Sequence, residues 1–465
     1  MEIESPEHLT AAEKENDTNS ADSVTKPSHS TIEPPASPEP VTVLNVTETG
    51  SQLFFTLENV DVSIANAIRR TILSNIETVV FRTSPHERND CVIYANNTKL
   101  NNEIIKQRLS CIPIHLRNIS PERLADMKME LNVENTSGEY RMVTTKDFRV
   151  KYKGRYISEE DRDKIFPYSK IVSQKLGGKQ AYIDFVKLRP KIENVPGSHI
   201  HLECGFSYGK ASEDGSFNVV STCSYGFTKD ETRVEEAYHK KSDELTQKGL
   251  SEEEVRFALK DWLLLDSFRI TKPNSFDFVI ESVGVYPNRE IVARACLYLI
   301  QLFLRIDQVC KVTYTGPRKK TSPSSSSDVI PPPSPPPSSP SSPSAPSAPS
   351  ATATVAGNSV TEMPEILLDY EYLIYVNEED YTIGKILERF LYKKYFEESG
   401  EMTFCGFRKE HPHDAYAIIR VWYKSPTQDE EVMMHLKSVA KEARMILGEI
   451  VREMVPDMTP QATWL

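Results

Sequence analysis

The sequence predicts an α+β protein with two related modules, each a sheet with a long helix, that pair with each other within the chain. The first sign is a repeat: residues 59–73 and 378–392 both contain Asp, one residue, a hydroxyl residue, Ile, a small residue and a later Arg. The second is that each module ends in a long helix with one apolar stripe. The third is a series of short strand-like runs within 119–272, which predicts a mostly β domain inserted into the first module.

Each copy of the repeat predicts a strand, a tight turn and a helix. Strand-like runs at 53–57 and 372–376 precede the two copies. Ser63 and Thr382 follow them and are predicted as helix N-caps, because a side-chain oxygen there can accept a free backbone N–H of the first turn.

The first of these helices has two distinct faces at 100° per residue. The predicted core face consists of Ile64, Ala67, Ile68, Thr71 and Ile72. The opposite face gathers two guanidinium groups and one apolar residue, a composition typical of protein-docking surfaces, and consists of Asn66, Arg69, Arg70 and Leu73. An ordinary solvated face is the alternative. The second copy carries Lys385, Glu388, Arg389 and Tyr392 at the equivalent positions, which favours docking.

The two long helices are predicted at about 287–306 and 430–455, each with apolar residues three or four positions apart. A stripe of that length needs a partner, and the other module of the same chain is the simplest one. We therefore expect the modules to dimerise through Ile291, Tyr298, Leu302, Leu436, Val439, Ile446 and Ile450.

Composition changes along the chain suggest the domain boundaries. Ser or Pro occupies 24 of the 30 residues from 321 to 350, which is typical of an extended, solvated spacer. The inserted domain ends in a charged helical stretch, about 230–262. The predicted organisation is a disordered tail at 1–40, a first module at 41–118 and 273–315, an inserted domain at 119–272, a linker at 316–361 and a second module at 362–465.

Composition also limits the function. A net charge of −12 argues against a protein that coats nucleic acid, and no run approaches the length of a membrane span. The seven cysteines include no C-x-x-C pair, which fits a reducing compartment and argues against a disulfide framework or a zinc knuckle.

The search for an active site finds no candidate. The D-x-D motif at 161–163 lies in a charged run typical of a solvated loop, and His411 and His413 flank a proline in a predicted loop. No G-x-S-x-G motif is present. The sequence therefore predicts no catalytic residue, no cofactor and no metal.

Residues 60–70 resemble the signature of the alpha-type subunits of multisubunit RNA polymerases. More narrowly, they are similar to the third subunit of eukaryotic RNA polymerase II and its archaeal equivalent. Three more stretches agree, at 108–114, 143–148 and 278–284. The C-terminal module resembles the eleventh subunit at 380–384 and at 404–407, with His411-Pro412 shortly after.

The resemblance implies a dimer of alpha-like modules, formed through the long helices, on which the largest and second-largest polymerase subunits assemble. Contact with DNA would then be only indirect. Asn66, Arg69, Arg70 and Arg108 would dock the second-largest subunit, with Leu73 on the same face. Lys385 and Arg389 would face the largest subunit.

Two subunits joined in one chain resemble the arrangement in large nucleocytoplasmic DNA viruses. This origin implies the viral factory in the host cytoplasm, and the virion as a further location; otherwise the nucleus is expected. Three features depart from the family pattern. Lys385 stands where Asn is usual and Tyr381 where His is usual. The metal-binding cysteine cluster of the third subunit is missing, because the inserted region holds only Cys204 and Cys223.

Two alternatives remain open. The chain could be a free scaffold or regulator that binds polymerase subunits without being a core subunit, or an enzyme housed in 119–272. Stoichiometry separates the first from a core subunit, which is present once per active complex.

Overall fold

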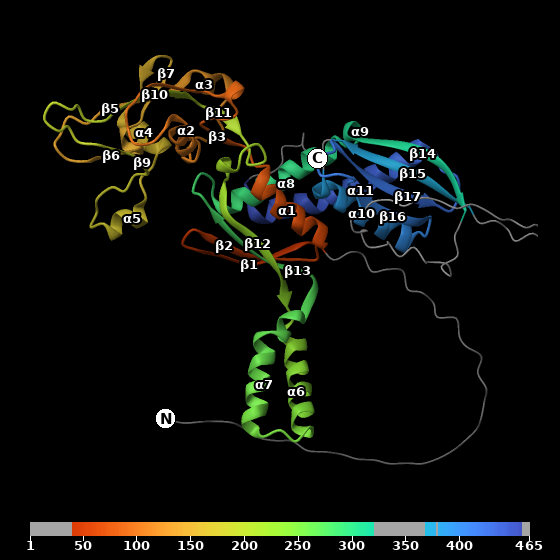
Figure 1. Ribbon diagram of the computed structural model, residues 1–465. Coiled ribbons are helices and arrows are strands. Elements are labelled where there is room, and N and C mark those ends of the chain that lie inside the picture. Colours follow the sequence, from red (N-terminus) through yellow and green to blue (C-terminus); the bar gives the residue numbers. More distant parts are fainter. Residues whose placement is uncertain (1–39, 320–367, 378–379, 458–465) are drawn as a thin grey trace, which may run out of the picture. The chain divides into compact units, whose positions relative to one another are not determined.

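The computed structural model describes residues 40–319, 368–377 and 380–457 (Figure 1). Its helices and antiparallel sheets confirm the predicted α+β class. The predicted tail at 1–40, apart from Pro40, and most of the predicted linker, 320–361, lie outside the described residues. Among the helices in the described ranges, none is long and apolar enough to cross a membrane.

The first module is a four-stranded antiparallel sheet, in the order β1-β2-β13-β12, with two helices. One helix follows the β1-β2 hairpin and the other follows β13. The elements are β1 (Thr42–Thr49), β2 (Gln52–Glu58), α1 (Val62–Ser74), β12 (Val220–Lys229), β13 (Thr271–Ser282) and α8 (Asn288–Leu304).

The second module repeats this plan. Its antiparallel sheet has the order β14-β15-β17-β16, so in both sheets the first strand pairs with the second, the second with the fourth and the fourth with the third. The repeat therefore extends over hairpin, helix, hairpin and helix. The elements are β14 (Cys310–Lys319), β15 (Leu368–Asn377), α10 (Tyr381–Leu391), the π-helical turn η6 (Tyr392–Glu398), β16 (Met402–Arg408), β17 (Tyr416–Tyr423) and α11 (Asp429–Met454).

A separate lobe is inserted between α1 and β12, with its own hydrophobic core from Val79 to Phe206. Its main sheet has the order β4-β10-β5-β7-β8, and β6 pairs with β9 and β3 with β11. The strands are β3 (Thr78–Val80), β4 (Cys91–Asn96), β5 (Met127–Glu134), β6 (Arg141–Thr144), β7 (Arg149–Tyr152), β8 (Arg155–Tyr156), β9 (Asp184–Leu188), β10 (His199–Gly205) and β11 (Ser207–Gly209). The helices are η1 (His86–Arg88), α2 (Asn102–Ser110), α3 (Pro121–Ala125), η2 (Thr145–Asp147), α4 (Glu159–Ile165), α5 (Lys170–Lys175) and η3 (Gly215–Phe217).

A helical hairpin joins β12 to β13. It consists of α6 (Glu231–Gln247) and α7 (Glu252–Leu264), followed by the short η4 (Asp266–Arg269). The single charged helix predicted at 230–262 is therefore two helices. Gly249 adopts a φ of 74° that ends the first, and Ser251 begins the second with a reciprocal capping box to Glu254.

Strand pairing places the module boundaries differently from the predicted ones. The inserted lobe begins with β3 at Thr78, not at 119, because Val79 and Phe81 pack in its core. β12 lies within the predicted insertion but pairs with β13 in the first module's sheet. The predicted boundary after residue 315 divides β14 between the first module and the linker, but β14 pairs with β15 in the second module's sheet.

The two modules share one hydrophobic core, in which α8 and α11 lie side by side (Figure 1). The short helix α9 (Ile306–Val309) leads from α8 directly into β14. The Ser/Pro-rich segment therefore falls between β14 and β15, inside the second module, and does not separate the modules.

Candidate interface between the two modules

The helices α1 and α10 contact each other through the aspartates that precede them and through arginines further along each helix. Each starts after an aspartate that caps it: Asp61 Oδ1 accepts the backbone N–H of Ser63 at 2.8 Å, and Asp380 Oδ1 accepts that of Thr382 at 2.8 Å. The prediction that Ser63 and Thr382 are the N-caps is therefore wrong by two residues. Both residue types cap well, and the backbone turns helical immediately after the aspartate.

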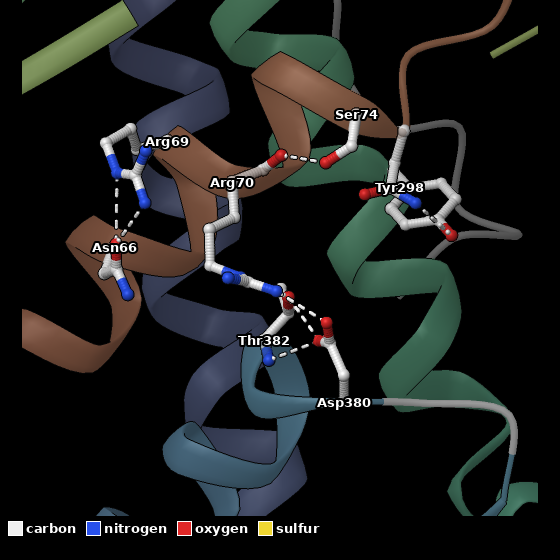
Figure 2. Close-up of polar contacts among 8 residues, drawn as sticks. Asn66, Arg69, Arg70, Ser74, Tyr298, Asp380 and Thr382 are labelled. Atoms are coloured by element: carbon white, nitrogen blue, oxygen red, sulfur yellow. Dashed lines mark hydrogen bonds and ion pairs between the residues drawn. The ribbon is translucent and has the colours of Figure 1, made fainter. Parts of the chain in front are cut away.

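Each capping aspartate also binds an arginine of the opposite module. Arg70 Nη2 lies 2.5 Å from Asp380 Oδ2, and Arg70 Nε donates to Thr382 Oγ1 at 3.0 Å (Figure 2). In the other direction, Arg389 Nε donates to Asp61 Oδ2 at 3.1 Å. Each arginine follows the aspartate of its own copy by the same interval, so the two pairs are reciprocal. We call these four side chains the reciprocal clamp.

Burial and charge act against each other within the clamp. Burial opposes ionisation of Asp380, but hydrogen bonds from Thr382 and the charge of Arg70 outweigh it and hold the pKa of this carboxyl below its usual value. Burial would likewise lower the pKa of Arg389, but the Asp61 carboxylate raises it. Both groups are therefore charged at neutral pH.

The lowered pKa of Asp380 predicts that the Arg70–Asp380 pair weakens in acid. A carboxyl whose folded pKa is depressed stabilises the protein above its unfolded pKa, and that stabilisation is lost as the pH falls through the folded pKa. We expect Asp380→Asn, which keeps a capping oxygen, to lower the free energy of unfolding at about pH 6, and this difference to shrink as the pH falls below about 4. Urea titrations of both proteins across this range measure the difference, and a constant difference would contradict the assignment.

The structure gives the other predicted docking residues of the first module different roles. Arg69 donates from Nε and Nη2 to Asn66 Oδ1 on its own helix, at 3.1 and 2.9 Å (Figure 2). Leu73 is half-buried and packs against the shared core. Arg108 lies in α2, where Nη2 donates to the backbone oxygen of Asp184 at 3.1 Å.

In the second module, Lys385 Nζ lies 2.5 Å from Glu388 Oε2, and Glu388 Oε1 accepts the backbone N–H of Phe407 at 3.0 Å. Phe407 packs so closely on α10 that a Cβ at Gly384 would lie 1.9 Å from its ring. The small residue of the repeat is therefore required here by a close contact between helix and sheet.

A groove of about 510 Å³ lies between α1 and α10 and brings together docking residues predicted separately in the two modules. Asn66 lines it from α1, and Lys385 and Arg389 line it from α10. Arg69 and Arg108 do not line this groove, nor does Leu73. The remaining lining residues are Asp61, Val62, Ser63, Ala67, Tyr225, Tyr381, Glu388, Tyr392 and Cys405.

The residues predicted for dimerisation all lie in the shared core. Five of them are buried: Ile291, Leu302, Leu436, Val439 and Ile450. Tyr298 and Ile446 are half-buried against the same core. Tyr298 also accepts a hydrogen bond on its hydroxyl from Asn75 Nδ2 at 3.2 Å, which links α8 to the end of α1.

Asp61 and Asp380 are the interface residues that the sequence prediction missed. The signal was present, because both copies of the repeat contain an aspartate at the same distance before an arginine. That the aspartate of one copy meets the arginine of the other follows only from the antiparallel approach of the two helices.

The cysteines of the inserted lobe do not fit the metal cluster of the family's third subunit. Cys91 and Cys204 face each other across β4 and β10 and are buried. The Cys204 thiol donates a hydrogen bond to Cys91, and this bond together with burial raises the pKa of Cys204, while the same bond lowers the pKa of Cys91. The two buried thiols therefore pair with each other. In the described ranges, no group of three or more His, Cys, Asp or Glu residues could hold a metal ion.

Comparison with known proteins identifies the family of the first module. The family model described as the RNA polymerase Rpb3/Rpb11 dimerisation domain matches residues 54–303, more than half of the chain. The chain therefore belongs to this family of alpha-like dimerisation domains. The match ends within α8, so the second module lies outside it.

The relatives are distant but cover a large part of the chain. It is 23% identical over 288 residues to the human DNA-directed RNA polymerases I and III subunit RPAC1, covering 54% of this chain and 79% of the human protein. It is 22% identical over 258 residues to the RNA polymerase subunit Rpo3 of Archaeoglobus fulgidus, covering 52% and 87%. A Tetrahymena thermophila protein called conjugation stage-specific protein is 29% identical over 182 residues, covering 36% and 53%; the chain thus spans about half of that relative's length.

Proposed function

We propose that this chain is a non-catalytic assembly subunit of a multisubunit DNA-directed RNA polymerase, and that it supplies both halves of the alpha-like dimer. The observation that carries the proposal is the double pairing of the modules: α1 with α10 through the reciprocal clamp, and α8 with α11 through the shared core. A dimer that is otherwise made from two chains is thereby formed within one, which removes the concentration dependence of its formation.

The largest and second-largest polymerase subunits are the proposed partners of the α1–α10 surface, with other polymerase subunits joining the complex. Arg70 and Arg389 bind the opposite module, so they hold the surface together rather than project from it. Asn66 and Lys385 line one groove, so a single segment of a large subunit inserted there would contact both modules. Arg69, half-buried on α1 and fixed by Asn66, is the proposed contact for the second-largest subunit.

Affinity purification of the tagged chain, followed by mass spectrometry and a nonspecific transcription assay, tests the proposal. Recovery of both large subunits at one copy per chain, together with RNA synthesis, is the expected result. Recovery of the chain with substoichiometric partners and no activity would instead support a free scaffold or regulator.

We expect Arg69→Glu to reduce recovery of the second-largest subunit about tenfold or more, because reversing a charge at an interface places like charges against each other. The free energy of unfolding should fall by only about 1 kcal/mol, the usual net contribution of the hydrogen bonding to Asn66 that is lost. Arg155→Glu, an exposed change in β8 of the inserted lobe, is the control. If the Arg69→Glu variant recovers the second-largest subunit normally, Arg69 is not part of the docking surface.

The cellular compartment is part of the proposal. A viral origin would place the chain in the cytoplasmic factory, and a cellular one in the nucleus. Immunofluorescence of the endogenous protein distinguishes the two.

A further inference from the structure

The helices α6 and α7 form a hairpin (Figure 1). It carries exposed apolar side chains that packing within the hairpin does not require. Its inner face is already complete, with Val234 and Leu245 of α6 and Leu259 of α7 buried. The rings of Tyr238 and Trp262 lie 6.5 Å apart and close the same side. A two-helix hairpin needs only one such face.

A second apolar group lies on the outer face of α7 and in the residues that directly follow the helix. Phe257, Leu264, Leu265 and Phe268 are each between 61% and 76% exposed. Phe257 and Leu264 are seven residues apart and therefore lie on the same side of the helix. Leu265 caps α7 and Phe268 follows in η4, where Lys229 Nζ lies 5.7 Å from its ring centre. We call these four residues the α7 outer patch.

The charge around the patch limits what can cover it. Around Phe257, the residues three or four positions away on α7 are the acidic Glu253, Glu254 and Asp261 and the basic Lys260. Lys229 beside Phe268 is a second base at the patch. Across 230–269 the sequence holds eleven acidic and seven basic residues. A nucleic acid or an anionic membrane surface would be repelled, and a second copy would bring acidic side chains against each other.

We propose that the α7 outer patch docks a protein segment whose apolar side chains are interspersed with Lys or Arg. Large exposed side chains in one group are uncommon on a free surface, and aromatic anchors such as Phe257 and Phe268 are the residues that fill a partner's pockets. The acidic rim then selects a basic partner and speeds its association. This inference goes beyond the proposed function and does not depend on it.

The test uses the full chain with the photoreactive p-benzoylphenylalanine in place of Phe257, isolated with its natural partners. The same group in place of Tyr140, an apolar residue of the inserted lobe that is 58% exposed, is the control. Irradiation should join position 257 to one protein, in a segment where apolar residues alternate with Lys or Arg. A synthetic peptide of that segment should bind the full chain.

The double variant Phe257→Ser/Leu264→Ser should weaken the peptide's binding about tenfold or more, as loss of two interface anchors does. Tyr140→Ser/Met142→Ser should leave binding unchanged, and both variants should unfold like the unaltered chain, since all four side chains are exposed. The proposal is overturned if crosslinking at position 257 is no stronger than at position 140, or if the crosslinked segment has no basic residues. A crosslink to a second copy of the chain would also overturn it, as would equal binding of the peptide to the double variant and the unaltered chain. Recovery of the large polymerase subunits, scored in the same preparation, reports separately on the proposed function.

Discussion

Leu436→Asp is expected to lower the free energy of unfolding by at least about 4 kcal/mol, because losing a buried leucine costs about 2–5 kcal/mol and burying a carboxylate adds to that. Leu436 is fully buried in the core that α8 and α11 share, so the cost falls on the pairing of the two modules. Urea unfolding followed by circular dichroism measures it. Met434→Asp is the matched control on the same helix: Met434 is 66% exposed, and its change should stay within about 0.5 kcal/mol.

The same variants test whether the modules hold together without an intact chain. A protease site inserted within 320–361 cuts the chain between β14 and β15, which remain paired over the length of both strands. We expect the two fragments of the unaltered protein to stay together through this strand pair, the clamp and the α8–α11 contact. Leu436→Asp should release them and Met434→Asp should not. If the unaltered fragments separate at micromolar concentration, the proposal of an intramolecular dimer is contradicted.

The parts of the fold that the sequence predicted well are those with strong periodicity. The buried face of α1 contains every predicted core residue, and five of the seven residues predicted for dimerisation in α8 and α11 are buried. The helix α8 is buried on more sides than one stripe predicts, because Val292, Cys296 and Leu299 are also buried. β1 and β14 were missed. β1 has alternating polar residues at a sheet edge, and β14 contains Gly316 and Pro317, which are typical of a linker.

One error of the sequence prediction, the missed break between α6 and α7, could have been avoided from the sequence itself. Gly249 followed by Ser251 and Glu254 is the pattern of a helix end and a new capping box, so the break between α6 and α7 was available in the sequence. The boundary of the inserted lobe was not, because β3 joins that lobe only by pairing with β11, more than a hundred residues later. Pairing between distant strands leaves no local trace.

The contacts of the reciprocal clamp could not be predicted from the sequence for a similar reason. A helical wheel assigns Arg70 to a polar face but cannot tell solvent from an approaching helix. The structure shows that Arg69 and Arg70, neighbours in sequence, have different environments: Arg69 contacts its own helix and Arg70 contacts the other module. Changing both to Glu would mix the two effects, so they must be changed separately.

Arg70→Glu combined with Arg389→Glu is expected to lower the free energy of unfolding by about 3–4 kcal/mol. Each partly exposed pair contributes about 1 kcal/mol, and each glutamate adds a repulsion of similar size against an aspartate. The loss should shrink in 1 M salt, which screens exposed charges. Urea unfolding at low and high salt measures both quantities. Arg69→Glu, one residue from Arg70, should lose only about 1 kcal/mol at either salt concentration, because it removes hydrogen bonds to Asn66 and no pair between modules.

The reciprocal arrangement makes a sharper prediction, because it states which aspartate each arginine meets. In double-mutant cycles, Arg70→Ala should couple to Asp380→Asn by about 0.5–1 kcal/mol and be additive with Asp61→Asn. Arg389→Ala should show the opposite pattern, coupling to Asp61→Asn and adding to Asp380→Asn. Coupling within one module would contradict the crossed pairs, since each arginine would then bind the cap of its own helix. Asn keeps the capping oxygen in every cycle, so the coupling measures contact between modules and not the loss of a helix cap.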